Sequence, residues 1–114
     1  MSHIDFLAVG DIVTEPFIRL QEASVHTDPK TGSQELCMRF GDKIPYEFAE
    51  LAVAVGNASN AAVAASRLGL TSALRAYVGN DEYGPQCINR LTEEKVLTDY
   101  MVTEEGKKTN YHYV

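Results

Sequence analysis

Short apolar runs in the first part of the chain predict strands. Residues Ile4–Val9 form a run that ends at Gly10, which is typical of a buried strand followed by a turn. Two further strand-like runs, Phe17–Val25 and Glu35–Phe40, flank residues 27–33, which are rich in turn-forming side chains. We therefore predict a hairpin inserted directly after the first strand.

The middle of the chain alternates between helix and strand patterns. A run of small residues, Ala61–Arg67, predicts a helix that Ser59 or Asn60 caps. A strand is expected over Thr71–Val78, and a second helix is expected to begin near Pro85. The order strand, insertion, helix, strand and helix predicts a parallel α/β layout.

The end of the chain returns to β-rich patterns. Residues Thr98–Thr103 and Thr109–Val114 favour strands, and the polar segment Glu104–Lys108 separates them. This spacing predicts a second hairpin.

Composition and charge narrow the possible functions. The 114 residues suffice for one domain, and 45% of them are hydrophobic. Ten basic against 16 acidic residues give a net charge of −6 without a basic cluster, which argues against a nucleic-acid partner. No apolar run is long enough to span a bilayer, and no signal-peptide pattern opens the chain. We expect a cytoplasmic protein that does not bind membranes.

Cysteines and histidines give no metal-binding pattern. Cys37 and Cys87 lie far apart, and we expect both to be buried free thiols. His26 and His112 are isolated, so no metal site is expected.

The segment that starts at Gly56 carries the most chemical information. Gly56 permits close backbone approach, and Asn60 lies near a helix start, where N–H groups point outward. The Asn60 amide can both donate and accept, which suits a sugar hydroxyl. An ordinary capped helix packed on a sheet would also explain this spacing.

At these residues the chain resembles the ribokinase-type (PfkB family) carbohydrate kinases. Their N-terminal signature has fixed spacings, which are met here by Gly56, Ala58, Asn60, Ala62, Gly69 and Gly79. Val55 departs from the signature, which has Gly or Ala there. The turns at residues 10–15 and 79–84 and the segment 94–109 are also similar to the family.

The resemblance implies a fold and an activity. Family members transfer the γ-phosphate of ATP to a sugar or nucleoside hydroxyl, and combine a doubly wound α/β domain with a small β-sheet lid. Residues 1–114 would form the N-terminal part of such a domain. The two hairpins, approximately 12–41 and 97–114, would form the lid, and approximately 3–10 and 51–96 the α/β core.

The resemblance also assigns substrate-binding positions. Glu15 matches a family Asp that binds sugar hydroxyls, and Val13 stands where ribokinase has Asn, so the substrate need not be ribose. Asp11, beside the same turn, could contribute to binding or simply cap the turn.

A second group of positions follows from the same family. Gly56, Asn57 and Asn60 match its second sugar-contacting loop. Tyr111 and Tyr113 share one face of a predicted lid strand, where they could cover a sugar, pack within the lid or contact a second subunit.

The family's catalytic segment is not found in this sequence. Its Gly-x-Gly-Asp run supplies the catalytic Asp, and Gly41-Asp42, preceded by Phe40, does not match it. We therefore expect no catalytic residue in this chain and no activity from it alone. ATP and Mg²⁺ are expected in the full-length protein, and no cofactor is expected for this part.

Other interpretations remain open at this point. The chain could be a stand-alone, non-catalytic module for sugar binding or dimerisation. A small nucleotide-binding domain is disfavoured because no Gly-x-Gly-x-x-Gly or P-loop follows the first strand. We also expect a two-fold homodimer through apolar side chains of the lid strands, with candidates Phe17, Ile18, Leu36, Met38, Met101 and Val102.

Overall fold

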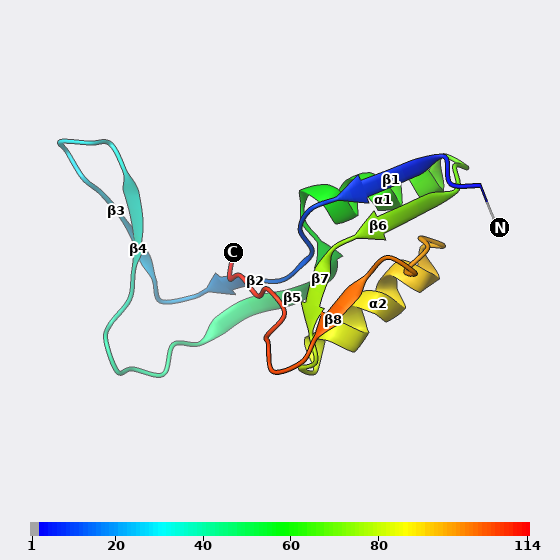
Figure 1. The fold of residues 1–114 in the computed structure, drawn as a ribbon. Helices are drawn as coiled ribbons and strands as arrows, with labels where there is room; N and C mark the ends of the chain where they lie inside the picture. The colour runs from blue at the N-terminus through cyan, green and yellow to red at the C-terminus, as the bar shows by residue number, and fades with distance from the viewer. Residues whose placement is uncertain (1–2) are drawn as a thin grey trace. The chain divides into compact units, whose positions relative to one another are not determined.

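The computed structural model describes residues 3–114, which form two compact units. The first unit comprises the chain up to Pro16 together with Leu51–Val114, and the second comprises Phe17–Glu50. In chain order (Figure 1), the elements are β1 (Phe6–Val9), β2 (Val13–Leu20), β3 (Ser24–Thr27), β4 (Gln34–Cys37), β5 (Tyr46–Val55), α1 (Asn57–Arg67), β6 (Ser72–Arg75), β7 (Tyr77–Gly79), α2 (Tyr83–Glu93) and β8 (Val102–Glu104).

The core of the first unit is a parallel strand pair covered by helices. β1 pairs with β6 in register from Phe6 opposite Ser72 to Val9 opposite Arg75, and α1 packs on both strands (Figure 1). The small side chains of α1 allow this close packing. The Ser72 hydroxyl donates to the Ala62 carbonyl over 2.8 Å, so this buried group is satisfied. The predicted parallel α/β layout is confirmed.

The strand predicted over Thr71–Val78 is interrupted at Ala76, and its second part has a new partner. β7 pairs with β8 in parallel, and the Val102 amide donates to the Ala76 carbonyl over 3.0 Å. Met101, expected among the lid side chains, instead packs against the core.

The second predicted hairpin is wrong. Residues 109–114 run parallel to the start of β2, where the Thr14 amide donates to the Asn110 carbonyl over 2.9 Å. After the turn at Gly106, the chain crosses the backbone of Gly79, where a Cβ atom would collide with the Lys107 carbonyl. This crossing leads the chain to β2 instead of back along β8.

The second unit contains the hairpin predicted around residues 27–33. β3 and β4 pair antiparallel from Ser24 opposite Cys37 to Thr27 opposite Gln34. In the turn, the Asp28 carboxylate accepts a hydrogen bond from the Lys30 amide over 2.8 Å. The predicted strand Phe17–Val25 is broken after Leu20, so that its first part belongs to β2, and the second predicted strand ends at Cys37 rather than Phe40. Cys37 is exposed, which corrects the expectation that both thiols are buried.

The sequence analysis missed β5, which pairs with β2. The boundary between the two units falls within both strands. The segment from Tyr46 to Val55 carried a strand signal, because most of its side chains are apolar, but Ala49 and Glu50 break the alternation that Tyr46, Glu47 and Phe48 begin. Among residues 3–114, no helix is both long and apolar enough to cross a membrane.

Candidate functional site

Two of the predicted substrate-binding segments meet where β1 ends and α1 begins. The Asp11 carboxylate accepts a hydrogen bond from the Ala58 amide over 3.1 Å. A Cβ atom at Gly56 would lie 2.9 Å from Asp11 Oδ2, and one at Gly10 would lie 2.9 Å from the Ala58 Cβ. Both glycines are therefore required for this contact. In open α/β sheets, ligands bind outside the carboxyl ends of the strands, where this junction lies.

The start of α1 differs from the predicted cap. The helix begins at Asn57, and neither Ser59 nor Asn60 caps it. The Ser59 hydroxyl is buried and donates to the Ala54 carbonyl over 2.8 Å. The Asp11 carboxylate takes the capping role from another part of the chain, because it accepts an amide of the first turn. This contact with α1 differs from the cap of its own turn that the sequence suggested for Asp11, and it leaves the predicted role in substrate binding untested.

Glu15 lies on β2 between Thr14 and Pro16, whose backbones are hydrogen-bonded to residues 110–114. Thr14 is fully buried, and its hydroxyl lies 3.6 Å from the Cys87 sulfur. Burial raises the pKa of the Cys87 thiol above its ordinary value. Glu15 itself is half-buried, and its carboxylate accepts no hydrogen bond from the part of the chain that the structure describes.

Three tyrosines gather beside this strand. The ring centroids of Tyr111 and Tyr113 lie 5.4 Å apart with nearly perpendicular planes, consistent with the predicted shared face. Tyr83, from the first turn of α2, lies 4.8 Å from Tyr111. Sequence reasoning did not select Tyr83, because its nearness to Tyr111 depends on the tertiary fold.

An aspartate in the turn before α2 holds the last segment of the chain. Asp81 accepts hydrogen bonds from the Thr109 hydroxyl (2.7 Å), the Thr109 amide (3.0 Å) and the Gly84 amide (3.2 Å). Burial raises the pKa of Asp81, but these hydrogen bonds outweigh it and hold the pKa below its ordinary value. The Gly-x-Asp-x-x-Gly spacing marked this turn in the sequence, but not its partner Thr109.

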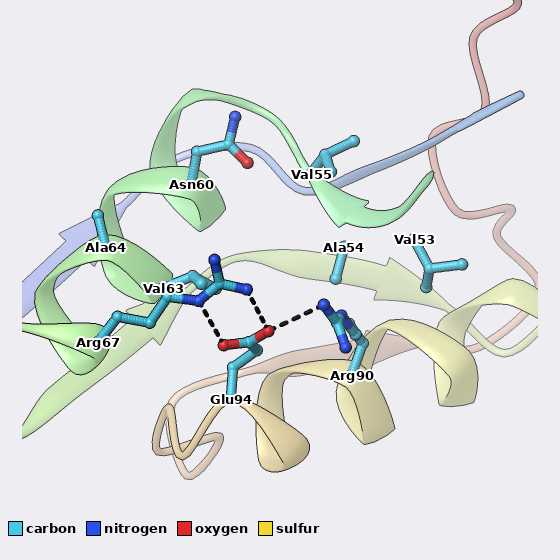
Figure 2. A pocket seen from close by; sticks show the side chains of 9 residues that line it. All are labelled: Val53, Ala54, Val55, Asn60, Val63, Ala64, Arg67, Arg90 and Glu94. Carbon is cyan, nitrogen blue, oxygen red and sulfur yellow. Dashed lines mark hydrogen bonds and ion pairs between the residues drawn. The ribbon is translucent and has the colours of Figure 1, made fainter. Parts of the chain in front are cut away.

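A cavity of about 340 Å³ opens between α1 and α2 (Figure 2). Its lining is apolar on one side and charged on the other, and consists of Val53, Ala54, Val55, Asn60, Val63, Ala64, Arg67, Arg90 and Glu94. Of the predicted substrate-binding residues, only Asn60 lines it. Asp11, Glu15, Gly56 and Asn57 do not. The cavity therefore does not coincide with the predicted substrate site.

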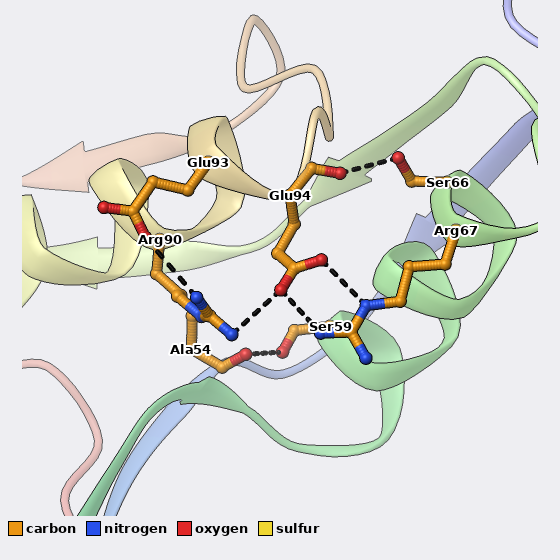
Figure 3. Close-up of polar contacts among 7 residues, drawn as sticks. All are labelled: Ala54, Ser59, Ser66, Arg67, Arg90, Glu93 and Glu94. Atoms are coloured by element: carbon orange, nitrogen blue, oxygen red, sulfur yellow. Dashed lines mark hydrogen bonds and ion pairs between the residues drawn. The ribbon is translucent and has the colours of Figure 1, made fainter.

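The charged side of the cavity is an ion-pair cluster around Glu94 (Figure 3). Arg67 donates to both carboxylate oxygens over 2.8 and 2.6 Å, and Arg90 approaches the same carboxylate within 2.8 Å. The side chain of Glu94 is only 13% exposed. Hydrogen bonds from Arg67 outweigh burial and lower the pKa of Glu94, and the same contact raises the pKa of Arg67. This cluster joins the ends of α1 and α2.

The sequence and its fold match known carbohydrate kinases. The pattern of the pfkB family of carbohydrate kinases matches residues 35–114. An uncharacterised sugar kinase of Pyrococcus horikoshii is 42% identical over 59 residues, which cover 52% of this chain and 19% of that protein. Its crystal structure matches 96% of this chain and 31% of its own, with a TM-score of 0.62 and 28% identity.

A further structural match shows the same fold at lower identity. Arabidopsis thaliana ribokinase, solved with ribose and ATP, matches with a TM-score of 0.76 and 16% identity, covering 96% of this chain and 31% of its own. The chain thus spans less than a third of the length of these relatives. From the matched residues 35–114, we conclude that the chain belongs to the pfkB family of carbohydrate kinases.

Proposed function

We propose that the protein containing this chain is an ATP-dependent kinase that phosphorylates a hydroxyl of a sugar or nucleoside, and that this chain supplies its substrate-binding portion. The observation that carries the proposal is the junction of Asp11 with Gly56 and Ala58 at the end of β1. It brings together two segments that the family resemblance had assigned to the substrate, although they lie far apart in the sequence.

In this proposal, the residues at the junction hold the acceptor. The Glu15 carboxylate accepts hydrogen bonds from the substrate hydroxyls, which are its natural donors. The amides of Asn57 and Asn60, at the start of α1, donate to or accept from other hydroxyls. Asp11 keeps the start of α1 in place through Ala58. Tyr111 and Tyr113 present aromatic faces that suit the apolar face of a sugar.

The phosphate-transferring groups lie outside this chain in the proposal. Transfer from ATP requires Mg²⁺, an anion-stabilising loop and a residue that orients the attacking hydroxyl. The sequence contains no Gly-x-Gly-Asp run that would provide the last two. The second unit, Phe17–Glu50, would supply the lid; its hairpin exposes apolar side chains, such as Val25 and Leu36, that could cover a ligand or another lid.

A panel of sugars and nucleosides tests this proposal. The protein containing this chain is mixed with ATP, Mg²⁺ and each acceptor, and ADP release is followed. We expect release above the acceptor-free rate with at least one acceptor. If every acceptor leaves ADP release at the background rate while the protein remains folded, the proposed function is wrong.

A further inference from the structure

We propose that Asp81 is a positioning residue for Glu15, which it influences through Thr109 and residues 110–114. The inference rests on the proposed function, in which Glu15 binds the acceptor. Asp81 does not touch the acceptor in this account. It fixes residues 110–114, the segment beside which the Glu15 backbone lies.

The first link joins Asp81 to Thr109. The carboxylate accepts one hydrogen bond from the hydroxyl of Thr109, over 2.7 Å, and one from its amide, over 3.0 Å. The Thr109 hydroxyl also accepts the Gly79 amide over 3.0 Å, and Thr109 is 5% exposed. Two charge-assisted hydrogen bonds to one buried residue define both its position and its orientation.

The second link joins the segment after Thr109 to both neighbours of Glu15. The Thr14 amide donates to the Asn110 carbonyl over 2.9 Å, and the His112 amide donates to the Thr14 carbonyl over 3.1 Å. The Val114 amide donates to the Pro16 carbonyl over 3.1 Å. Residues 14 and 16 are therefore both hydrogen-bonded to the segment that starts at Thr109.

The packing around this segment leaves little freedom for it to shift. A Cβ atom at Gly79 would collide with the Lys107 carbonyl, and one at Gly84 would lie 3.4 Å from the Thr109 hydroxyl and collide with the Gly79 carbonyl. The chain thus crosses the Gly79 backbone just before Thr109, and the Thr109 hydroxyl then lies beside Gly84. Loss of the Asp81 contacts would release the segment at the point where it turns toward Thr14.

The test compares Asp81→Asn with Asp5→Asn in the protein containing this chain. Asp5 is a matched control, because its carboxylate also joins two distant segments, through the Thr71 amide over 2.8 Å, but at the other end of β1. We expect Asp81→Asn to raise the acceptor KM roughly tenfold, because a displaced Glu15 would lose one charge-assisted hydrogen bond to the acceptor. The KM for ATP should stay unchanged. Asp5→Asn should leave both constants unchanged.

Amide hydrogen exchange provides a readout that does not need activity. In Asp81→Asn, peptides covering residues 13–16 and 109–114 should exchange faster, and in Asp5→Asn they should not. Thr109→Val, which removes only the hydroxyl, should act in the same direction. Thr109→Ser, which keeps it, should restore the wild-type acceptor KM. These two variants keep the test valid if Asp81→Asn does not fold.

The inference and the proposed function fail in different ways. If no acceptor supports ADP release by the wild type, the proposed function is wrong, and exchange alone decides whether Asp81 positions residues 14–16. If the wild type is active but Asp81→Asn and Thr109→Val leave the acceptor KM unchanged, the inference is overturned. Unchanged exchange in both peptides also overturns it.

Discussion

The Asp11 carboxylate caps α1, a helix that begins far along the chain: it accepts a hydrogen bond from the amide of Ala58, 47 positions later, over 3.1 Å. The contact leaves no room for a side chain at Gly56, where a Cβ atom would lie 2.9 Å from the second carboxylate oxygen. It thereby fixes the distance between the turn after β1 and the start of α1. This junction is the structural basis of the proposed substrate site.

Substitution Gly56→Ala should disrupt this junction. The φ angle of Gly56 is 107°, which an alanine adopts only under strain, and the new Cβ would also press on Asp11. We expect a loss of about 2–3 kcal/mol in the free energy of unfolding, measured by urea denaturation. Gly32→Ala is the control: its φ is 73°, but nothing lies within 4 Å of the added Cβ. An equal loss in both variants would contradict the role of the Asp11 contact.

Glu15→Ala should impair acceptor use more than Asn60→Ala. A hydrogen bond to a charged group contributes about 1.5–3 kcal/mol, against about 0.5–1.5 kcal/mol for a neutral one. The loss should appear in kcat/KM for the acceptor, measured by ADP release, with the KM for ATP nearly unchanged. Wild-type acceptor kinetics in Glu15→Ala would show that the family's carboxylate position does not transfer to Glu15.

The Glu94 cluster should make stability depend on pH in the acid range. Because Arg67 lowers the pKa of Glu94 in the folded state, the ionised form stabilises the fold above the unfolded pKa of about 4.3. This stabilisation is lost as the pH falls through the lower folded pKa. The Tm difference between wild type and Glu94→Gln should therefore be full at pH 7 and shrink below about pH 4.

Glu105→Gln is the control for this measurement, because Glu105 is exposed in the turn after β8. It should leave the Tm close to that of the wild type at every pH. A Tm difference for Glu94→Gln that stays constant from pH 7 to pH 3 would show that its carboxylate charge does not stabilise the fold.

Association through the β3–β4 hairpin is a separate prediction. Leu36 and Met38 on this hairpin are 62% and 51% exposed, and such apolar strands promote pairing between copies. We expect a dimer mass by light scattering at micromolar concentration, and a monomer mass after Leu36→Lys with Met38→Lys. Leu68→Lys, at the exposed end of α1, should leave the dimer intact. A monomeric wild type would contradict this prediction.

Local patterns in the sequence predicted the elements with strong turn or helix signals. The β3–β4 turn, the helix after Gly56 and the helix near Pro85 are confirmed. The second hairpin is wrong, because its strands were paired by their closeness in sequence. Their real partners are β7 and the start of β2, which only the tertiary fold brings near.

The candidate site shows the same limit. Glycine and asparagine spacing marked Gly56 and Asn60 in the sequence, and the family resemblance added Glu15. The contact of Asp81 with Thr109 joins residues 28 positions apart, and no pattern links them. The sequence suggested that Asp11 binds substrate or caps its own turn, and no pattern pointed to its contact with the amide of Ala58 in α1.

The identity of the reaction product tests the central claim most directly. The protein containing this chain is incubated with ATP, Mg²⁺ and a sugar or nucleoside acceptor, and the acceptor is analysed by mass spectrometry. The account predicts an acceptor that carries one added phosphoryl group, formed by the wild type and strongly reduced in Glu15→Ala. The 114-residue chain alone should form none. ATP hydrolysis to ADP and phosphate with every acceptor unmodified would contradict the account.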